Sequence, residues 1–360
     1  LPDLLSASAL ALAMIRLRDG LTASPHAIRY LGQSPRLALG SARWPGDGCD
    51  PLFLVQSARI ARLFSESGGS QINAYDPSMD AASSDTQALL DELRSALLHD
   101  DTLDLHLQPQ VKVSTGQCIG AEILLRWQRK NGEWIEPAQI LEAIDRLGLR
   151  QTFNRWLFHR SAQIHEQLAK EGIDIALSIN LSANDLLDIE LPDMIGQALA
   201  VRDIAPEKIV LEITETMMVE ESKQVMDVIS HLRKLGLRLA IDDFGTGYAG
   251  MGYLQRLPVQ EVKIDQMFVR QAADSHKARE IISSVIQLAN RLGLHVVAEG
   301  VESAKTLGVL SSLGCRFAQG FLFAEALPPP AFIKWWQQLQ SAADATADKA
   351  PLAKKPDFSG

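Results

Sequence analysis

The 360-residue sequence lacks the features that identify several common classes of protein. It has only three cysteines, which lie far apart and match no zinc-ligand spacing: Cys49, Cys118 and Cys315. Such sparse cysteines predict a reducing, cytoplasmic compartment and no disulfide framework. No apolar run is long enough to span a bilayer. The best candidate, residues 4–17, contains Arg16 and lacks a basic leader, so it predicts an amphipathic helix rather than a signal peptide.

Positive charge is also scarce, because 35 Lys and Arg stand against 44 Asp and Glu and the formal net charge is −9. A general DNA- or RNA-binding protein usually has a basic face, so we expect no such function. The sequence contains no HExxH, GxSxG or GxxxxGK(S/T) pattern, which argues against zinc protease, serine hydrolase and P-loop chemistry. The first residue is Leu1 rather than Met, so we expect a piece of a longer protein, with any membrane attachment in regions outside this chain.

Composition divides the chain into three parts. Residues 76–85 are rich in Asp and Ser, contain Pro77 and show no periodicity, which predicts a polar linker. We therefore expect a small N-terminal segment over residues 1–80 and a main domain over residues 81–340. Residues 341–360 are rich in Ala, Asp, Lys and Pro, which predicts a disordered tail.

Within the main domain, strand-like and helix-like segments alternate. Eight expected strands begin at Leu103, Cys118, Asp174, Lys208, Arg238, Glu261, His295 and Arg316. Eight strands with intervening helices predict an α/β fold of the (β/α)8, TIM-like type. Only a short turn around Thr115 separates the first two strands, which leaves no room for a crossover helix. We therefore expect the first strand to be antiparallel and to form a hairpin with the second.

Acidic and amide side chains gather at the predicted C-terminal ends of these strands, where such barrels carry their active sites. Any one of them alone would more often be a helix cap or a salt-bridge partner. Carboxylates that converge on one barrel mouth repel one another and raise each other's pKa, and a divalent cation relieves that repulsion. Oxygen ligands without His or Cys favour Mg²⁺ or Mn²⁺. The candidates are Glu122, Arg126, Asn180, Glu212, Glu215, Asp242, Asp243, Lys263, Asp265, Glu299, Glu302 and Gln319.

Together these motifs resemble the EAL domain family over about residues 90–336. The signature tripeptide stands as Glu122-Ile123-Leu124, with Ile123 in place of the usual alanine. Further matches are SINLS, LEITET, IDDFGTGY, VKID, AEGVE and QGF. The resemblance implies a barrel with one reversed strand, which agrees with the hairpin expected above. It also implies hydrolysis of cyclic di-GMP to linear pGpG with two Mg²⁺ or Mn²⁺ ions.

The resemblance also implies a role for each matching residue. Glu122, Asn180, Glu212 and Asp242 look like ligands of one metal. Asp243 looks like a ligand of a second, with Asp242 bridging the two. Lys263 would hold or deprotonate the attacking water, and Glu299 would bind metal or assist as a base. Glu215 would brace the loop after the fifth strand. By the same resemblance, substrate binding would fall to Arg126, Asp265, Glu302 and Gln319.

Two further expectations come from resemblance. Residues 37–76 look like the back half of a GGDEF domain, but no GG(D/E)EF string occurs, so we expect a partial, degenerate GGDEF-like segment without cyclase activity. An unrelated small α/β segment is the alternative. EAL domains commonly pair, so we also expect a homodimer.

Two other functions stay open for the barrel. One is a non-catalytic cyclic di-GMP receptor that uses the same pocket. The other is a Mg²⁺-dependent barrel enzyme acting on enolisable acids, which would lack the Asp242–Tyr248 loop sequence.

Overall fold

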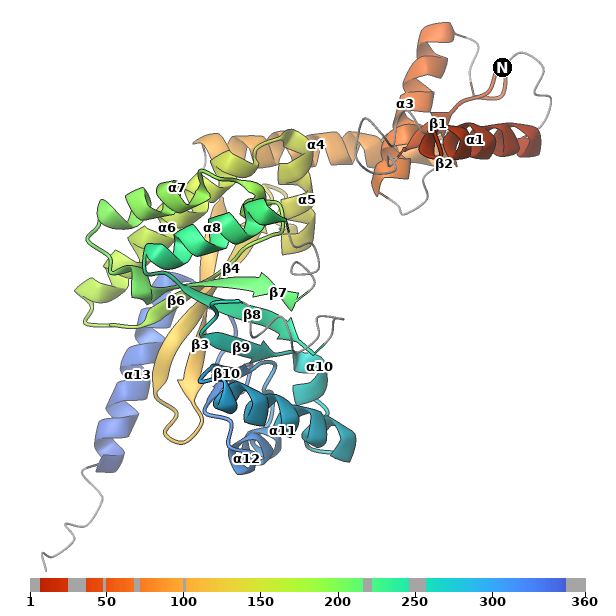
Figure 1. The fold of residues 1–360 in the computed structure, drawn as a ribbon. Helices are drawn as coiled ribbons and strands as arrows, with labels where there is room; N and C mark the ends of the chain where they lie inside the picture. Colours follow the sequence, from red (N-terminus) through yellow and green to blue (C-terminus); the bar gives the residue numbers. More distant parts are fainter. Residues whose placement is uncertain are drawn as a thin grey trace, which may run out of the picture. The chain divides into compact units, whose positions relative to one another are not determined.

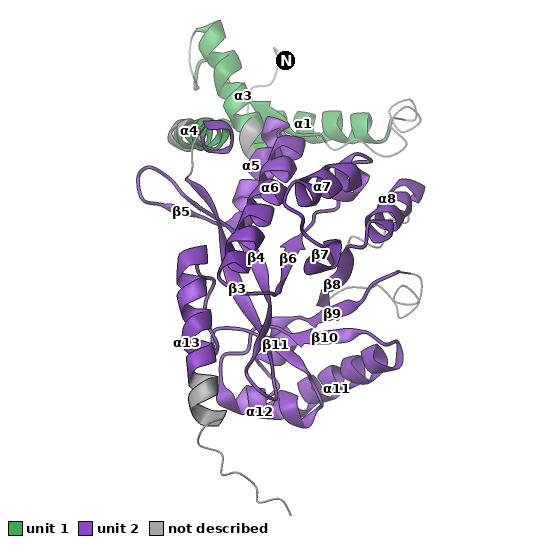
Figure 2. Ribbon diagram, turned by 90° about the vertical axis from the view of Figure 1, so that its left-hand side faces the viewer, with its two compact units in different colours: residues 1–95 green, residues 96–360 purple. Residues whose placement is uncertain are grey.

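The computed structural model describes residues 7–24, 37–47, 50–67, 72–99, 102–215, 222–245 and 257–347. The chain forms two compact units, Leu1–Ser95 and Ala96–Gly360, drawn in green and purple in Figure 2. The division falls inside helix α4 (Ser78–His99). The sequence boundary at residue 80 therefore stays a prediction.

The polar stretch expected to be an irregular linker is largely the beginning of α4, so that interpretation was wrong for residues 78–85. Asp76 caps this helix, because its Oδ1 accepts hydrogen bonds from the backbone N of Ser78 (2.9 Å) and from the Ser78 hydroxyl (2.6 Å). Asp and Ser favour turns and helix N-termini alike, and here they begin a helix.

The first unit is a small α/β segment, as the sequence predicted. It contains α1 (Ala7–Thr22), β1 (Leu39–Ser41), α3 (Pro51–Ser67) and β2 (Ile72–Ala74), and β1 pairs with β2 in parallel. Gly40 lets β1 approach α3 closely, since a Cβ atom there would clash with the backbone of Ala58 and Arg62. The amphipathic helix expected at residues 4–17 corresponds to α1, and its first residues lie outside the described part.

The second unit contains a closed barrel of eight strands. Figure 1 shows the barrel strands at the centre of this unit. Their spatial order is β3-β11-β10-β9-β8-β7-β6-β4, and pairing of β3 with β4 closes the ring. β3 is antiparallel to both neighbours and the other pairs are parallel, which confirms the reversed first strand. The strands are β3 (Leu103–Lys112), β4 (Cys118–Gln128), β6 (Ala176–Asn180), β7 (Ile209–Thr214), β8 (Arg238–Phe244), β9 (Glu261–Ile264), β10 (His295–Ala298) and β11 (Phe317–Gln319).

Helices cover the outside of the barrel (Figure 1). Three of them begin at serine N-caps, Ser222, Ser275 and Ser303, whose hydroxyls accept a backbone hydrogen bond three residues on. Short β5 (Trp134–Ile135) pairs in antiparallel register with the end of β4. The helices are α5 (Pro137–Leu147), α6 (Arg150–Lys170), α7 (Leu191–Ala200), α8 (Lys223–Lys234), α10 (Gln266–Val269), α11 (His276–Arg291), α12 (Ala304–Ser312) and α13 (Pro329–Ala347), with 3-10 turns at Asp185–Leu187 and Pro206–Lys208.

Helix α13 packs beside β3 and continues to Ala347, past the position at which the tail was expected to begin. Residues 348–360 lie outside the described part, so the disordered tail stays a prediction. Among the described helices, none combines the length and apolar character that a membrane span requires. Cys118 and Cys315 are buried free thiols, and Cys49 lies outside the described residues.

The two faces of the barrel strands differ in polarity, because successive side chains of a strand point to opposite faces. In β3, Leu103, Leu105 and Leu107 are almost fully buried on one face. Gln108 and Gln110 lie on the other face and are also buried. The second face is the inside of the barrel, where side chains of several strands meet. Polar groups therefore fill this interior toward one end.

Candidate active site at the barrel mouth

Lys263 on β9 lies at the centre of the polar interior and is fully buried. Its Nζ lies 2.6 Å from Glu299 Oε1, 2.8 Å from Glu212 Oε2, 3.2 Å from Glu122 Oε2 and 3.4 Å from Asp242 Oδ1. These acids come from β4, β7, β8 and the residue after β10. Four strands therefore deliver carboxylates to one ammonium group, as expected for the C-terminal mouth of a barrel.

The Glu122 carboxylate is held by donors from three directions. Asn180 Nδ2 donates to Oε1 at 2.7 Å, while Gln319 Nε2 (2.6 Å) and Lys263 Nζ (3.2 Å) donate to Oε2. Glu122 is only 6% exposed. A buried carboxylate with several donors has one fixed orientation. Ile123, its neighbour, points to the opposite face of β4, as the alternation of the strand requires.

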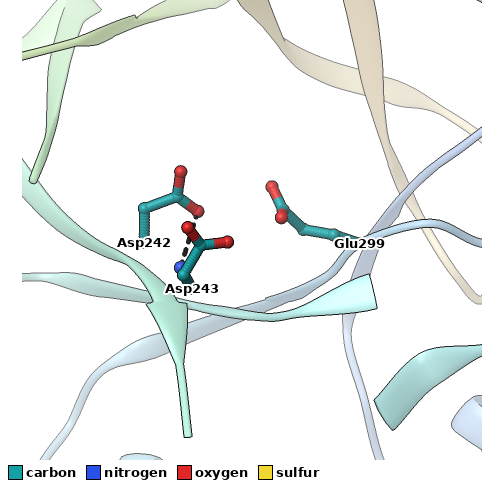
Figure 3. Close-up of side chains that lie close together, drawn as sticks. All are labelled: Asp242, Asp243 and Glu299. Carbon is teal, nitrogen blue, oxygen red and sulfur yellow. Dashed lines mark hydrogen bonds between the residues drawn. The ribbon is translucent and has the colours of Figure 1, made fainter. Parts of the chain in front are cut away.

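Asp242 and Asp243 both reach the mouth although they are consecutive in β8. In a regular strand they would point to opposite faces. The register between β8 and β9 shifts between Ile241 and Phe244, and Asp243 has a left-handed backbone with φ of 53°. This bulge turns the second carboxylate toward the first. Figure 3 shows both converging on Glu299, with the Asp243 backbone N donating to Asp242 Oδ1 at 3.0 Å.

The donor set of this mouth fits a hard divalent cation. Asp242, Asp243 and Glu299 each offer an oxygen, and these oxygens lie within 4.8 Å of one another. Glu212 Oε1 is buried and has no hydrogen-bond partner within the described structure. A buried carboxylate oxygen without a donor is costly, and a cation would satisfy it. All these donors are oxygens, the ligand type that Mg²⁺ and Mn²⁺ prefer.

Electrostatics keep Lys263 charged. Burial alone lowers the pKa of Lys263, but the carboxylates of Glu122, Glu212, Glu299 and Asp242 outweigh it, so the pKa lies well above its ordinary value. Burial likewise raises the pKa of Glu122, but the charge of Lys263 and hydrogen bonds from Gln319 and Asn180 bring it below 4.5 on balance. Lys263 is therefore an ammonium donor at neutral pH, and a poor base.

The remaining acids share more negative charge than one ammonium can neutralise. Burial, opposed by Lys263 and reinforced by Glu122 and Asp242, raises the pKa of Glu212 well above 4.5. Burial and the neighbouring Asp242 and Glu122 raise the pKa of Glu299 to about 8 against the effect of Lys263. Burial, Asp242 and a hydrogen bond with Asp265 raise the pKa of Asp243 to about 6. Without a cation, this mouth takes up protons.

Two further acids shape the loops around the mouth. Glu215 is buried just after β7, and its Oε2 accepts a hydrogen bond from the backbone N of Gly245 at 2.9 Å. The role expected for Glu215, bracing the loop after the fifth strand, stays a prediction, because residues 246–256 lie outside the described part. Asp265 begins α10 by accepting from the backbone N of Met267 at 2.6 Å. Asp265 also forms a side-chain hydrogen bond with Asp243.

A pocket of about 160 Å³ opens next to the acids. Its walls include Glu122, Asp242, Glu299, Glu302 and Gln319 among the predicted residues. Glu302 pairs with Arg270 at 2.8 Å at the rim, and both are about half exposed. Sequence reasoning did not single out six other wall residues, which are Gln108, Gln266, Arg270, Gly300, Gly320 and Phe321.

Arg126 lies on the same face of β4 as Glu122, four residues closer to the C-terminal end of the strand. Its Nη1 donates to the Leu125 carbonyl at 2.9 Å. Burial lowers the pKa of the guanidinium, and the charges of Glu136 and Glu122 oppose that shift. The side chain is thus near the mouth but forms no wall of the 160 Å³ pocket.

A larger cavity of about 540 Å³ runs from the mouth toward the helical layer. Asn180, Asp242 and Asp243 line its polar end. Ile123, Leu141 and Leu157 line its apolar part, which lies between β4 and the helices α5 and α6. The unusual residue of the signature, Ile123, therefore packs behind the site.

Gln108 and Gln110 are among the buried polar residues of the interior that sequence reasoning missed. Their signal was present in β3, whose sequence LDLHLQPQV alternates apolar and polar residues. Alternation predicts one apolar and one polar face, and here the polar face is inside the barrel.

Comparison with known proteins adds to this geometry. The sequence model of the EAL domain matches residues 90–326. A cyclic di-GMP phosphodiesterase of Pseudomonas aeruginosa, PA2567, is 34% identical over 262 residues, which cover 72% of this chain and 44% of the relative. The cyclic di-GMP phosphodiesterase PdeR of Escherichia coli is 31% identical over 305 residues, covering 84% of this chain and 45% of the relative.

A solved structure titled as the PaMucR phosphodiesterase in complex with c-di-GMP is 34% identical to the chain, with a TM-score of 0.64. It covers 68% of this chain and 99% of its own length. The chain spans less than half the length of the two curated relatives above. None of these comparisons adds support for a GGDEF-like segment at the N-terminus, since the matched family model begins at residue 90.

Proposed function

Because this chain belongs to the EAL domain family, we propose that its barrel hydrolyses cyclic di-GMP to linear pGpG with two divalent cations, Mg²⁺ or Mn²⁺. The observation that carries the proposal is the ring of acids around buried Lys263. One ammonium group faces Glu122, Glu212, Asp242 and Glu299, with Asp243 beside them. Cations bind where negative charge is in excess, and a phosphodiester substrate would bind through those cations.

We assign the cation ligands by their donor atoms. Glu122, Asn180, Glu212 and Asp242 would hold the first ion, and Asp243 would hold the second together with Asp242. Two observations support this assignment. Glu212 Oε1 has no hydrogen-bond partner among the described residues, and the oxygens of Asp242 and Asp243 converge. When bound, such a pair of ions stabilises charge on the attacking and leaving oxygens of an in-line displacement at phosphorus.

Lys263 holds the attacking water rather than deprotonating it. Its pKa lies well above the ordinary value, so the side chain keeps its proton at neutral pH and donates hydrogen bonds. Glu299 is the candidate base, because its carboxylate lies beside Lys263 and among the converging oxygens of Asp242 and Asp243. Lys263 Nζ and Glu299 Oε1 are 2.6 Å apart, so the two groups act on the same region of the mouth.

The substrate lies over the mouth, next to Glu299. Gln319 and Glu302 are in the wall of the adjacent pocket, and Asp265 lies beside Asp243. Arg126 supplies a positive charge near Glu122 at the end of β4. We assign these four residues to substrate binding, with Arg126 as the group that suits a phosphate oxygen. Glu215 braces the loop that follows Asp243 through its bond to Gly245.

Product analysis tests the proposal. The full chain is incubated with cyclic di-GMP and Mn²⁺, and the nucleotides are separated by chromatography. Formation of pGpG supports hydrolysis, whereas binding of intact nucleotide without product supports the receptor function. Failure of cyclic di-GMP both to bind and to be cleaved overturns the proposal. Asp242→Asn, which removes one shared ligand charge, is the matched control.

We also propose that residues 37–76 are a degenerate GGDEF-like remnant without cyclase activity and that the barrel forms a homodimer in the cytoplasm. The parallel β1–α3–β2 arrangement is compatible with such a remnant but also with any small α/β segment. Incubation with GTP tests the first point, because any cyclic di-GMP formed would contradict it. Light scattering tests the second, since a monomer mass at full activity would remove the homodimer.

A further inference from the structure

Two glutamines of the reversed strand β3 have no role in the site assigned above, although both are buried inside the barrel. Gln108 is 9% exposed and Gln110 is 3% exposed. A buried amide costs free energy unless it is hydrogen-bonded. Both amides bond to Gln319: Gln319 Nε2 donates to Gln108 Oε1 at 2.9 Å, and Gln110 Nε2 donates to Gln319 Oε1 at 3.1 Å.

The reversal of β3 brings these side chains together. Residues directly opposite in paired strands point to the same face. Gln108 lies opposite Glu122 on β4, and Gln110 lies opposite Gln319 on β11. The glutamines therefore share the inner face with the acids.

Gly120 of β4 leaves the room that Gln110 needs. It is the residue opposite Gln110 in the β3–β4 pair. A Cβ atom at Gly120 would lie 2.8 Å from Gln110 Oε1, closer than carbon and oxygen atoms pack. Any larger residue at this position would displace the Gln110 amide.

These contacts determine which end of the Gln319 amide faces Glu122. Gln110 offers a donor, so it holds the oxygen end of Gln319. Gln108 offers an acceptor, so it holds the nitrogen end. The same nitrogen donates to Glu122 Oε2 at 2.6 Å. In the flipped amide an oxygen would face the carboxylate and repel it, and both glutamine contacts would be lost.

We propose that Gln108 and Gln110 are positioning residues, which fix the amide of Gln319 so that its nitrogen holds Glu122 Oε2 and leaves Oε1, the oxygen beside Asn180, for a cation. The inference rests on the metal ligands named in the proposed function. Neither glutamine acts on the substrate in this role, and both act through Gln319. The reversed strand thus serves the site as well as closing the barrel.

A double-mutant cycle with Gln110→Met and Gln319→Met tests the proposal in the full chain. Gln110 is the cleaner probe, because Gln108 also lines the 160 Å³ pocket. The readout is the affinity for Mn²⁺ alone, measured from the paramagnetic resonance signal of the free ion. We expect Gln110→Met to weaken Mn²⁺ binding about threefold to tenfold, the effect of one buried hydrogen bond. In the Gln319→Met background the same change should add nothing, since its partner is gone.

Two further variants separate positioning from general destabilisation. Gly120→Ala displaces Gln110 without removing it, and we expect it to weaken Mn²⁺ binding as Gln110→Met does. Gln260→Met is the matched control. Gln260 lies before β9, where its amide bonds to Leu239 and Pro258 at the other end of the barrel. This control should lower the melting temperature and leave Mn²⁺ affinity unchanged.

The outcomes distinguish this inference from the proposed function. Additive effects of Gln110→Met and Gln319→Met, or parent-like Mn²⁺ affinity in Gln110→Met, overturn the positioning role even if the parent chain makes pGpG. Coupled losses of Mn²⁺ affinity support it even if the parent chain makes no pGpG, in which case only the proposed hydrolysis fails.

Discussion

Lys263 Nζ lies 2.6 Å from Glu299 Oε1, and the lysine is fully buried beneath the barrel mouth. A buried ammonium group is stable only when acids compensate it. Here the acids outnumber the single ammonium group, because Glu122, Glu212 and Asp242 also lie within 3.4 Å of Lys263 Nζ. The Lys263 ammonium group therefore compensates the buried acids of the metal-free barrel and is also one of the groups assigned to catalysis.

Replacing Lys263 separates binding from turnover. We expect Lys263→Ala to lower the rate of pGpG formation about 10²- to 10⁴-fold, because the group that holds the water is lost. Cyclic di-GMP affinity measured in Ca²⁺ should stay close to that of the parent chain. Near-parent turnover of the variant would refute the assignment of this lysine to the water.

Divalent metal should be strictly required, and Ca²⁺ should inhibit. Ca²⁺ takes longer bonds and more ligands than Mg²⁺ or Mn²⁺, so it alters the spacing of the site.

Asp243→Asn should weaken binding of the second ion while leaving the melting temperature of the metal-free chain unchanged or higher, since it removes repulsion. Glu122→Ala should remove a ligand and most activity. Turnover as a function of Mn²⁺ concentration for the three proteins provides the measurement.

Stability of the metal-free chain should fall as pH rises from about 4.5 to about 8. Glu299 has a pKa of about 8 in the folded chain against 4.5 ordinarily, and Asp243 about 6 against 3.8. Between these values the folded state binds more protons than the unfolded state, so raising pH favours unfolding. The measurement is the melting temperature in chelator across this range. Glu299→Gln should flatten the profile, and saturating Mg²⁺ should remove it, because bound acids need no proton.

Ile123→Ala should destabilise the fold without impairing the chemistry. Ile123 is 4% exposed and faces the cavity next to Leu141 and Leu157, away from Glu122. Truncating a buried isoleucine costs about 2–5 kcal/mol. We expect a lower melting temperature with kcat within about threefold of the parent below the transition. A large loss of kcat in folded protein would show that Ile123 shapes the mouth.

Much of this fold was predictable from the sequence. All eight barrel strands begin within two residues of the expected positions, because buried strands read as apolar runs between helical patterns. The short link around Thr115 excluded a crossover helix and so predicted the reversed strand. Helix α4 was missed, because Asp and Ser begin helices as readily as they form turns.

The residues that form the site were predictable from the sequence, but their arrangement was less so. Acids at strand ends identified the carboxylates that surround Lys263. No local pattern revealed the bulge that turns Asp243 toward Asp242, since it depends on the register with β9. The network of Gln108, Gln110 and Gln319 joins residues about two hundred positions apart, so only the closed barrel brings them together.

Hydrolysis in H₂¹⁸O tests the central claim most directly. The chain is incubated with cyclic di-GMP and Mn²⁺, and the product is analysed by mass spectrometry. Attack of water at phosphorus predicts pGpG with one ¹⁸O in its terminal phosphate, formed only when Mn²⁺ or Mg²⁺ is present. Recovery of intact, unlabelled cyclic di-GMP from a chain that binds it, or equal labelling in chelator, would contradict metal-dependent hydrolysis at this barrel mouth.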